Sequence, residues 1–231
     1  MNPHLRSSAA HVFVDSLDAP ALSDEDAHHL FRVLRLRDGE VVSASDGLGR
    51  WRPCVARSGS LDPTGPIQPA AAAPAVTVAA AVPKGDRLDW MVQKLVEVGV
   101  QRIVLLDSAR GVVRWDADRV PRQLDRLRRM AREAASQSRR VWLPRIEGPC
   151  AVATVLAEPG AVLADPDGEP LIPSTSLGPV LVGPEGGWDR VELAAADAAG
   201  ASRVSLGATV LRVETAAVVA GVLASPTLMP R

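Results

Sequence analysis

Short apolar runs alternate with amphipathic segments from residue 75 onwards. The runs at 75–83 and 102–107 have the length and composition of buried strands. The segment 86–100 between them carries apolar residues at helical spacing. These residues are Leu88, Met91, Val92, Leu95 and Val96. A strand, a helix and a second strand make a β-α-β unit, so we predict an α/β fold with a parallel sheet.

Two strand-turn-helix junctions follow in the C-terminal third. At 179–187 (PVLVGPEGG), an apolar run predicts a buried strand that ends in a glycine turn, with a helix beginning near Asp189. At 205–215 (SLGATVLRVET), a strand ends, Gly207 turns and Arg212 opens the last helix. Ligands usually bind at the carboxyl edge of a parallel sheet, where backbone N–H groups are free. Each turn alone is also consistent with an ordinary strand-helix connection. Together, the two turns are expected to line one ligand-binding pocket.

The rest of the C-terminal part continues the same alternation. We predict a short helix at 152–157, a strand at 161–164 and a turn at 165–170 (DPDGEP). The last helix, 213–225, is apolar nearly all round and should be buried on more than one side. It either fills the domain core or packs against a second subunit.

Residues 1–70 are predicted to form a small β-rich domain. Short strand-like runs occupy 11–14, 40–44 and 51–56, and Asp46, Gly47 and Gly49 provide a turn between the last two. A helix is expected after Ser23, a suitable N-cap with Asp26 three residues on. Its apolar residues Leu30, Val33 and Leu34 stand at helical spacing.

Two features in or near this domain give no indication of a catalytic or metal site. His28 and His29 are adjacent and point about 100° apart on a helix, so we expect one to be packed and the other capping or solvated rather than a shared metal site. The stretch 59–74 is rich in proline, glycine and alanine and lacks periodicity, which favours a linker.

Composition is that of a globular protein, with 47% hydrophobic and 23% charged residues. The N-terminus lacks the apolar core of a signal peptide, and no apolar run is long enough to span a bilayer, so a cytoplasmic protein is expected. Cys54 and Cys150 are far apart, which indicates neither a disulfide framework nor a zinc site, and no metal site is predicted.

Charge is unevenly distributed although the net charge is only −1. Residues 71–149 carry 15 basic and 9 acidic residues, the only basic excess in the chain. The stretch from Arg114 to Arg145 contains ten arginines and four acidic residues. Most of these arginines lie on a long helix predicted at 118–138. Such a helix is either an exposed helix rich in salt bridges or a surface that follows nucleic-acid phosphates.

The motifs carry a resemblance. GPEGGW, followed about twenty residues later by LG-x-x-x-LR-x-ETA, resembles the cofactor-binding signature of the RsmE group of SPOUT methyltransferases, which methylate N3 of a uridine in small-subunit ribosomal RNA. Residues 83–100 (PKGDRLDWMVQKLVEVGV) and 132–140 (REAASQSRR) resemble the same family, and HHLFRVLRLRDGE resembles its N-terminal module.

The resemblance implies a PUA-like β-barrel that binds RNA over 1–70 and a SPOUT α/β domain with a deep C-terminal trefoil knot over 75–231. It also implies S-adenosylmethionine as cofactor, 16S ribosomal RNA, in the assembled small subunit, as the substrate, and a homodimer. Periodicity alone does not indicate a knot, because knots are rare.

Site residues follow from the same resemblance. Those expected to bind the cofactor are Leu181, Val182, Gly183, Pro184, Glu185, Gly186, Leu206, Gly207, Leu211, Arg212 and Thr215. Those expected to bind RNA are Arg32, Arg35, Lys84, Arg110, Arg114, Arg139 and Arg140. The family usually has a Glu and a Ser at the places of Ala109 and Gly111, so whatever those side chains do elsewhere is absent here.

The motifs that are absent from the sequence also favour a reaction in which the cofactor supplies the reactive group. The sequence contains no G-x-G-x-x-G, Walker or G-x-S-x-G motif, and its four histidines all lie within the first 29 residues, which disfavours histidine-based hydrolysis. S-adenosylmethionine brings an activated methyl group, whereas uridine N3 must lose a proton at neutral pH. Arg212 is the candidate to stabilise the uridine anion, and Glu214 to anchor Arg212, cap exposed N–H groups or act as the base.

Three alternatives to that assignment remain. In the first, the Arg212–Glu214 pair is a purely structural tie of the loop. A SPOUT methyltransferase with another RNA target, or a non-catalytic RNA-binding protein that keeps the fold, is also consistent with the sequence.

Overall fold

A computed structural model of the protein describes residues 2–72, 75–172 and 177–225. The chain forms two compact units. One comprises Met1–Ala73 together with Arg132–Leu143, and the other comprises Pro74–Ala131 and Pro144–Arg231. Among the described residues, no helix is both long and apolar enough to cross a membrane.

The N-terminal unit is built on one sheet. Its strands are β1 (Ala10–Phe13), β2 (Val41–Ser45), β3 (Arg50–Arg57), β4 (Ser60–Pro63) and β5 (Gln68–Pro69). The order is β1-β2-β3-β4, and β5 also pairs with β3. β1 and β2 are parallel and the other pairs are antiparallel. The three strands predicted here are confirmed.

The stretch 59–74 is not a plain linker, because β4 and β5 lie in it. β4 pairs with Cys54–Arg57 and β5 with Arg50 and Trp51, all on β3. Leu61 is buried in the core of this unit. Proline is tolerated in these strands because each lies at the edge of the sheet. Pairing with β3 therefore overrides the local composition.

The helix after Ser23 differs from an ordinary α-helix. Ser23 caps α2 (Asp24–His28) by accepting the N–H of Asp26, as predicted, but the chain continues as a π-helical turn, η1 (His29–Val33). Leu30 is buried, whereas Val33 and Leu34 are 58% and 50% exposed. The wider π-helical turn breaks the helical spacing that grouped these three residues.

Both adjacent histidines, His28 and His29, are exposed, so the expectation that one of them is packed is wrong.

The C-terminal end of α4 (Val120–Gln137) contributes to the N-terminal unit. Val141, just beyond the helix, packs with Leu5 and Trp51. The Arg132 guanidinium donates to the Phe13 carbonyl at 2.6 Å and lies 5.3 Å from the centre of the Phe13 ring. The segment 132–143 therefore helps to build the core of this unit. The same unit also contains the short helix α1 (Pro3–Ser7), which precedes β1.

The C-terminal unit contains a sheet of six strands. They are β6 (Thr77–Ala81), β7 (Arg102–Asp107), β8 (Arg145–Ala151), β9 (Val162–Pro170), β10 (Val180–Val182) and β11 (Ser202–Ser205). The order is β11-β9-β10-β6-β7-β8, and every neighbouring pair is parallel. The predicted α/β fold with a parallel sheet is confirmed.

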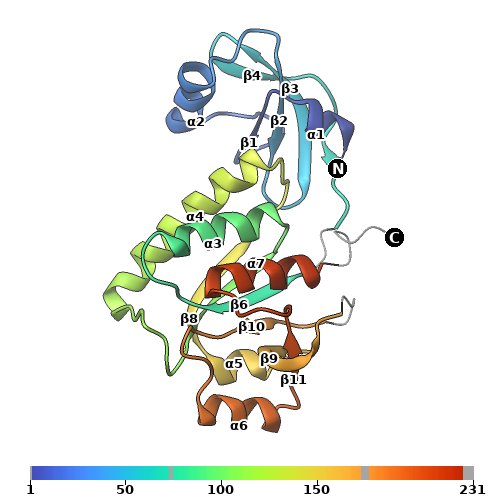
Figure 1. Ribbon diagram of the computed structural model, residues 1–231. Coiled ribbons are helices and arrows are strands. Elements are labelled where there is room, and N and C mark those ends of the chain that lie inside the picture. Colours follow the sequence, from blue (N-terminus) through green and yellow to red (C-terminus); the bar gives the residue numbers. More distant parts are fainter. Residues whose placement is uncertain (1, 73–74, 173–176, 226–231) are drawn as a thin grey trace. The chain divides into compact units, whose positions relative to one another are not determined.

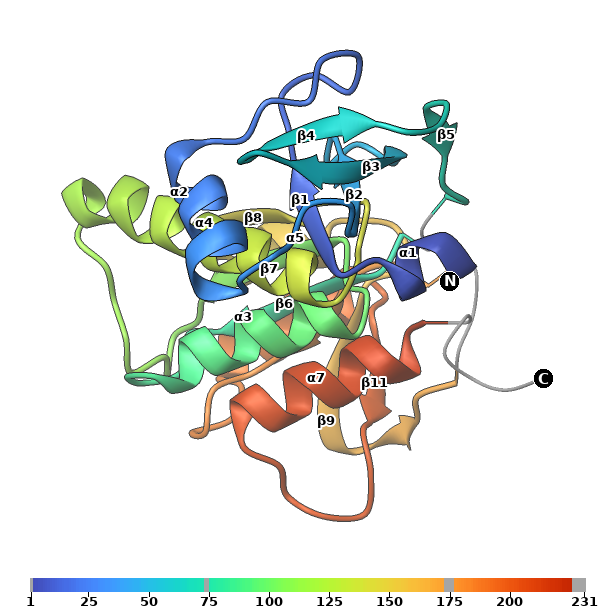
Figure 2. The ribbon, with the colours of Figure 1, turned by 90° about the horizontal axis from the view of Figure 1, so that it is seen from above.

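Helices cover both faces of this sheet (Figure 1). They are α3 (Arg87–Glu97), α4, α5 (Val152–Leu156), α6 (Arg190–Ala198) and α7 (Val213–Leu223), with a short 3₁₀ turn, η2 (Ala117–Arg119), before α4. α3 and α7 lie side by side on one face (Figure 2), and α5 and α6 pack together on the other. None of the five predicted core residues of α3 is more than 5% exposed.

Two expectations for this unit have different outcomes. The predicted turn at 165–170 is part of β9, because β11 pairs with Glu169 and Pro170 and extends the strand. The last helix, α7, is buried on several sides, as predicted, and it packs on α3, β6 and β10 within its own unit. It therefore fills the core of this unit, and its apolar character no longer argues for a second subunit.

Candidate active site at the carboxyl edge of the sheet

The loops that follow the parallel strands all lie at the same edge of the sheet. β10 pairs with β6, and β6 pairs with β7, so the loops after these three strands are neighbours. β11 lies two strands from β10, beyond β9, and its loop leads into α7. α7 returns to pack on β6 and β10, which brings the start of the last helix back toward the loop after β10.

The loop after β10 is held by Trp188. Its indole N–H donates to the carbonyl of Ala164 at 2.9 Å, and only 9% of the residue is exposed. A Cβ on Gly183 would lie 2.9 Å from the Trp188 ring. Glycine is therefore required at 183 to make room for the tryptophan. The glycine turn predicted from the sequence does not reveal this packing contact.

Glu192 joins this loop to the loop after β7. Asp189 and Glu192 form a capping box at the start of α6, with each side chain accepting the other's backbone N–H. The second Glu192 oxygen accepts the Ala109 N–H at 2.8 Å. Glu192 is 8% exposed, so its carboxylate is held by hydrogen bonds in a largely buried place. This role was not predicted from the sequence, although the Asp-x-x-Glu spacing at a helix start indicates a capping box.

Arg110 and Arg114 support the same region. Arg110 donates to the Gly186 carbonyl at 2.8 Å, which connects the loop after β7 with the glycine turn. Arg114 donates to the Asp107 carboxylate at 2.5 Å and to the carbonyls of Ser108 and Ala109 at 3.3 and 3.2 Å. Both arginines therefore shape the loop, and their role toward RNA stays a prediction.

Arg87 joins the two glycine-containing segments. It lies at the start of α3 and donates to the Glu185 carboxylate at 3.1 Å. The same guanidinium nitrogen lies 3.7 Å from Glu214 on α7. The local sequence does not single out Arg87, because Glu185 is 98 residues away along the chain and Glu214 is further still.

Glu214 is not positioned as the Arg212 anchor. Its side chain is 8% exposed, and within the described residues Arg87 is the cation in ion-pair range of its carboxylate. Its Oε2 atom is buried without a hydrogen-bond partner among those residues. Arg212 is exposed and forms the N-cap of α7 without a side-chain cap bond. The predicted Arg212–Glu214 contact is therefore replaced by an Arg87–Glu214 contact.

The segment after β11 leaves open space beside its backbone. Gly207 has φ of +149°, and nothing lies within 4 Å of the position a Cβ would take. The Ser205 hydroxyl donates to the Gly207 carbonyl at 3.1 Å. Leu206, Leu211 and Thr215 are half-buried around this turn. Unlike Gly183, Gly207 is therefore explained by its backbone conformation and not by packing.

The remaining residues predicted to bind RNA have different surroundings. Arg32, Arg35 and Lys84 are exposed. Arg139 is half-buried and donates to the carbonyls of Ser8 and Ala9, each at 3.1 Å.

Arg140 is also half-buried, and burial lowers the pKa of its guanidinium to about 10. The contacts of Arg139 and the burial of Arg140 favour roles inside the N-terminal unit, whereas the three exposed residues are available to a ligand.

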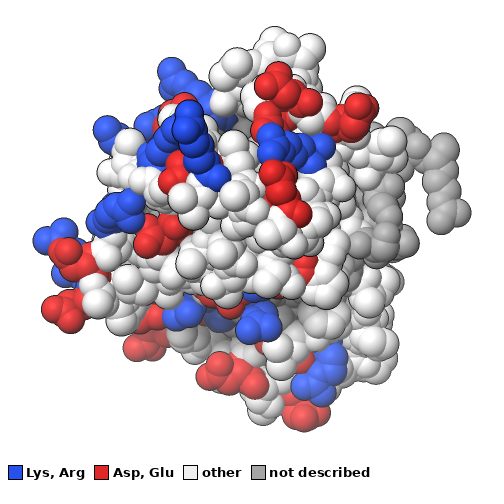
Figure 3. Space-filling model, turned by 90° about the horizontal axis from the view of Figure 1, so that it is seen from below, with Lys and Arg blue, Asp and Glu red and all other residues white. Residues whose placement is uncertain are grey.

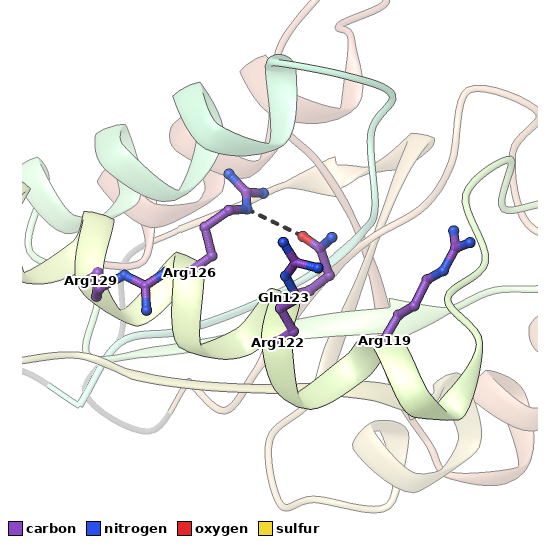
Figure 4. Close-up of a pocket in the computed structure, with 5 residues that line it drawn as sticks. All are labelled: Arg119, Arg122, Gln123, Arg126 and Arg129. Carbon is purple, nitrogen blue, oxygen red and sulfur yellow. Dashed lines mark hydrogen bonds between the residues drawn. The ribbon is translucent and has the colours of Figure 1, made fainter.

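Two of the cavities found among the described residues lie in the C-terminal unit. One, of about 290 Å³, adjoins the loop after β7 and the start of α6 and is lined in part by Ser108, Arg114 and Glu192. The other, of about 510 Å³, lies along α4 (Figure 4). Its lining residues are Arg119, Arg122, Gln123, Arg126 and Arg129.

Comparison with known proteins agrees with this architecture. Residues 71–225 match the RNA methyltransferase domain family, and residues 22–55 match the RNA methyltransferase PUA domain. A protein of Mycobacterium bovis named ribosomal RNA small subunit methyltransferase E is 38% identical over 92% of this chain and 91% of its own. A Bacillus subtilis protein of the same name is 27% identical over 86% and 87%.

A crystal structure has the same fold. It is that of ribosomal RNA small subunit methyltransferase E from Neisseria gonorrhoeae bound to S-adenosyl methionine, which is 26% identical and covers 92% of this chain and 94% of its own, with a TM-score of 0.79. A parallel α/β unit with loops joined at its carboxyl edge, in one chain with a PUA domain, defines the class as an RNA methyltransferase. Within that class, the chain belongs to the ribosomal RNA small subunit methyltransferase E family.

Proposed function

We propose that this protein transfers a methyl group from S-adenosylmethionine to N3 of a uridine in 16S ribosomal RNA. The observation that carries the proposal is the Arg87 bridge, which joins the loop after β10 to the start of α7. It brings together the two segments whose residues resemble the family's cofactor signature. The names of the relatives, and the S-adenosyl methionine bound to the Neisseria gonorrhoeae enzyme, support the part of the proposal that concerns methylation of small-subunit ribosomal RNA with this cofactor.

The residues present fit S-adenosylmethionine. This cofactor carries a sulfonium and an ammonium cation, and both glycine segments contribute a carboxylate, Glu185 and Glu214. The buried Oε2 of Glu214 lacks a hydrogen-bond partner among the described residues, which a bound polar group would supply. Beside Gly207 there is room for a ligand to approach the backbone.

The residues proposed to hold the cofactor are the two segments predicted from the sequence. The first runs from Leu181 to Gly186 and the second includes Leu206, Gly207, Leu211, Arg212 and Thr215. S-adenosylmethionine supplies an activated methyl group, so the protein has to align the acceptor and manage one proton.

The chain's own part in the chemistry falls to Arg212 and Glu214. Exposed at the start of α7, the Arg212 guanidinium is available to stabilise the uracil anion through the base's carbonyl oxygens. Glu214 is largely buried and lies beside Arg87, so we place it as a cofactor-facing acceptor that also orients the loop through Arg87. Deprotonation of N3 then depends on stabilisation of the anion by the site.

Three further features are part of the proposal. The last part of the chain forms the family's deep trefoil knot, and the N-terminal sheet closes into a PUA-like barrel that binds RNA. The protein acts in the cytoplasm as a homodimer on the assembled small subunit. Light scattering that finds a fully active monomer at micromolar concentration would contradict the dimer.

The test has two parts. Calorimetric titration with S-adenosylmethionine should show binding, and this result separates an enzyme from a non-catalytic RNA-binding protein. Small subunits from a strain that lacks the enzyme should then accept a methyl group at uridine N3. Methylation of a different RNA, or of another atom, would contradict the assigned substrate.

A further inference from the structure

The arginines in and around α4 fall into two groups according to what their guanidinium groups contact. Arg132 and Arg139 donate to backbone carbonyls of the N-terminal unit. Arg128 donates to Asp125 and to the Ile146 carbonyl. These three guanidinium groups are used within the fold, so the basic excess of this helix is not one uniform surface.

The second group forms a row along the first half of the helix, which we call the α4 arginine row. Its members are Arg119, Arg122, Arg126 and Arg129. Successive members are three or four residues apart, so they share one face of the helix. Over ten residues the row extends about 15 Å. Figure 4 shows these side chains along α4, with Gln123 between them accepting a hydrogen bond from Arg126 at 3.2 Å.

Part of this positive charge is not balanced. Arg126 pairs with Asp89 at 2.6 Å, and Arg119 lies 3.5 Å from Asp116, where the two side chains are 75% and 79% exposed. Arg122 and Arg129 are exposed, and within 2–72, 75–172 and 177–225 their guanidinium groups have neither an ion-pair partner nor a hydrogen bond. Two cations without a partner in the described part of the chain therefore lie beside a cavity of about 510 Å³.

The geometry selects the kind of anion. A small anion is held where donors converge on it from several directions. Here the lining side chains come from the last residue of η2 and the first half of α4, and they follow the helix axis, which suits charges that are repeated along a strand. Arginine also matches phosphate through paired N–H donors. A polyanion with regularly spaced phosphates is therefore the ligand that complements the row.

We propose that the α4 arginine row binds the phosphate backbone of ribosomal RNA away from the target uridine. The inference rests on the proposed function for the identity of the RNA. Contacts of this kind position the substrate without reading its sequence. Their loss should therefore raise KM for RNA and leave kcat unchanged, because they are equally strong in the ground state and the transition state.

The test compares the double variant R122Q/R129Q with the unmodified protein. Among the described residues, neither guanidinium has an ion pair or a hydrogen bond to lose, and glutamine is a good helix former, so the variant should fold. Affinity for 16S rRNA is measured over a range of salt concentrations. The slope of log affinity against log salt should become shallower by about 1.5, because each phosphate contact accounts for about 0.7–0.9.

Two controls accompany the double variant. R122K/R129K keeps both charges and should keep the salt slope. R203Q removes a cation that is already paired with Asp197 at 3.1 Å and Asp165 at 3.8 Å, and it should bind RNA as the unmodified protein does.

The outcomes separate this inference from the proposed function. An unchanged salt slope in R122Q/R129Q, while the unmodified protein methylates the small subunit, overturns the inference alone. If the variant binds naked rRNA normally and only the assembled subunit poorly, the row contacts protein and the inference is also wrong. Failure of the unmodified protein to methylate any subunit overturns the proposed function, whatever the slope.

Discussion

Glu214 and Arg212 differ in surroundings, although they are two residues apart. Glu214 is buried beside Arg87 with an oxygen that lacks a hydrogen-bond partner among the described residues, whereas Arg212 is exposed at the helix start. A buried acceptor and an exposed cation suit different tasks, the first toward the cofactor and the second toward RNA. The roles are therefore separable by experiment.

Single-turnover methylation should separate them. With cofactor and RNA saturating, Arg212→Lys should slow the chemical step about 10- to 100-fold, because lysine lacks the planar pair of donors that stabilises the uracil anion. Glu214→Gln should mainly weaken S-adenosylmethionine binding, which calorimetry measures. The reverse pattern, with slow chemistry in Glu214→Gln and lost cofactor binding in Arg212→Lys, would exchange the two assignments.

The two glycines of the site should respond differently to alanine. Gly183→Ala places a Cβ 2.9 Å from the Trp188 ring and should destabilise the fold by about 1–3 kcal/mol, which urea unfolding measures. Gly207→Ala meets no neighbour, but its φ of +149° disfavours a side chain. It should weaken cofactor binding with a smaller loss of stability. Equal stability losses in both variants would refute this distinction.

His11 should make the N-terminal unit sensitive to acid. The residue is 3% exposed, and burial, with the nearby Arg139 charge, lowers its pKa from 6.5 to about 4. Below pH 6.5 the unfolded chain takes up a proton that the folded protein does not, so stability falls as the pH drops toward 4. The expected loss between pH 7 and pH 5 is about 2 kcal/mol.

Urea unfolding at several pH values checks this expectation. His11→Gln removes the titrating group, so its stability should depend less on pH in this interval, even if the variant is less stable throughout. A loss of similar size in the variant would assign the acid sensitivity to other groups.

At the level of elements, α3 does more than cover the sheet. Its first residue, Arg87, reaches both the loop after β10 and the start of α7. Arginine is suited to this place because one guanidinium contacts two carboxylates. The helix thereby holds together two segments that the chain order separates.

Removal of this bridge should loosen the cofactor site. Arg87→Gln should weaken S-adenosylmethionine binding about 10-fold while the protein remains folded, because the Arg87 and Glu185 side chains are 33% and 39% exposed. Lys94→Gln, which removes the Lys94–Glu97 pair from the same helix, serves as the matched control and should bind normally. Equal cofactor affinity in Arg87→Gln and the control would show that the bridge is not needed.

The elements that the sequence predicted well are those set by burial. The apolar runs of β6, β7 and β10 and the buried face of α3 are visible in the sequence because both sides of a parallel sheet exclude water. β4, β5 and the end of β9 were missed because pairing with a neighbouring strand, rather than local composition, makes them strands.

The site was predicted in outline and not in its contacts. The glycine segments were found from their turns and from the family resemblance. The sequence did not reveal the partners of Arg87, Glu192 and Arg110, because each contact depends on which strands are neighbours in the sheet. Strand order cannot be obtained from local patterns, so Glu214 was paired with its sequence neighbour instead of with Arg87.

Across the whole molecule, charge is nearly balanced. The net charge is −1, and on the face shown in Figure 3 acidic and basic side chains are interspersed among larger uncharged areas. Attraction to RNA over a long range is therefore weak, and binding has to come from local groups of cations. The exposed Arg32 and Arg35 in one unit and the α4 arginine row in the other are such groups.

The central claim is that this chain methylates N3 of a uridine in 16S rRNA with S-adenosylmethionine as donor. The most direct measurement is incubation of the purified protein and labelled cofactor with small subunits from a strain that lacks the enzyme, followed by mass spectrometry of the rRNA nucleosides. We predict one methyl group per subunit, recovered as N3-methyluridine at a single position. No methyl transfer by protein that binds the cofactor, or transfer to a different nucleoside, would contradict the account.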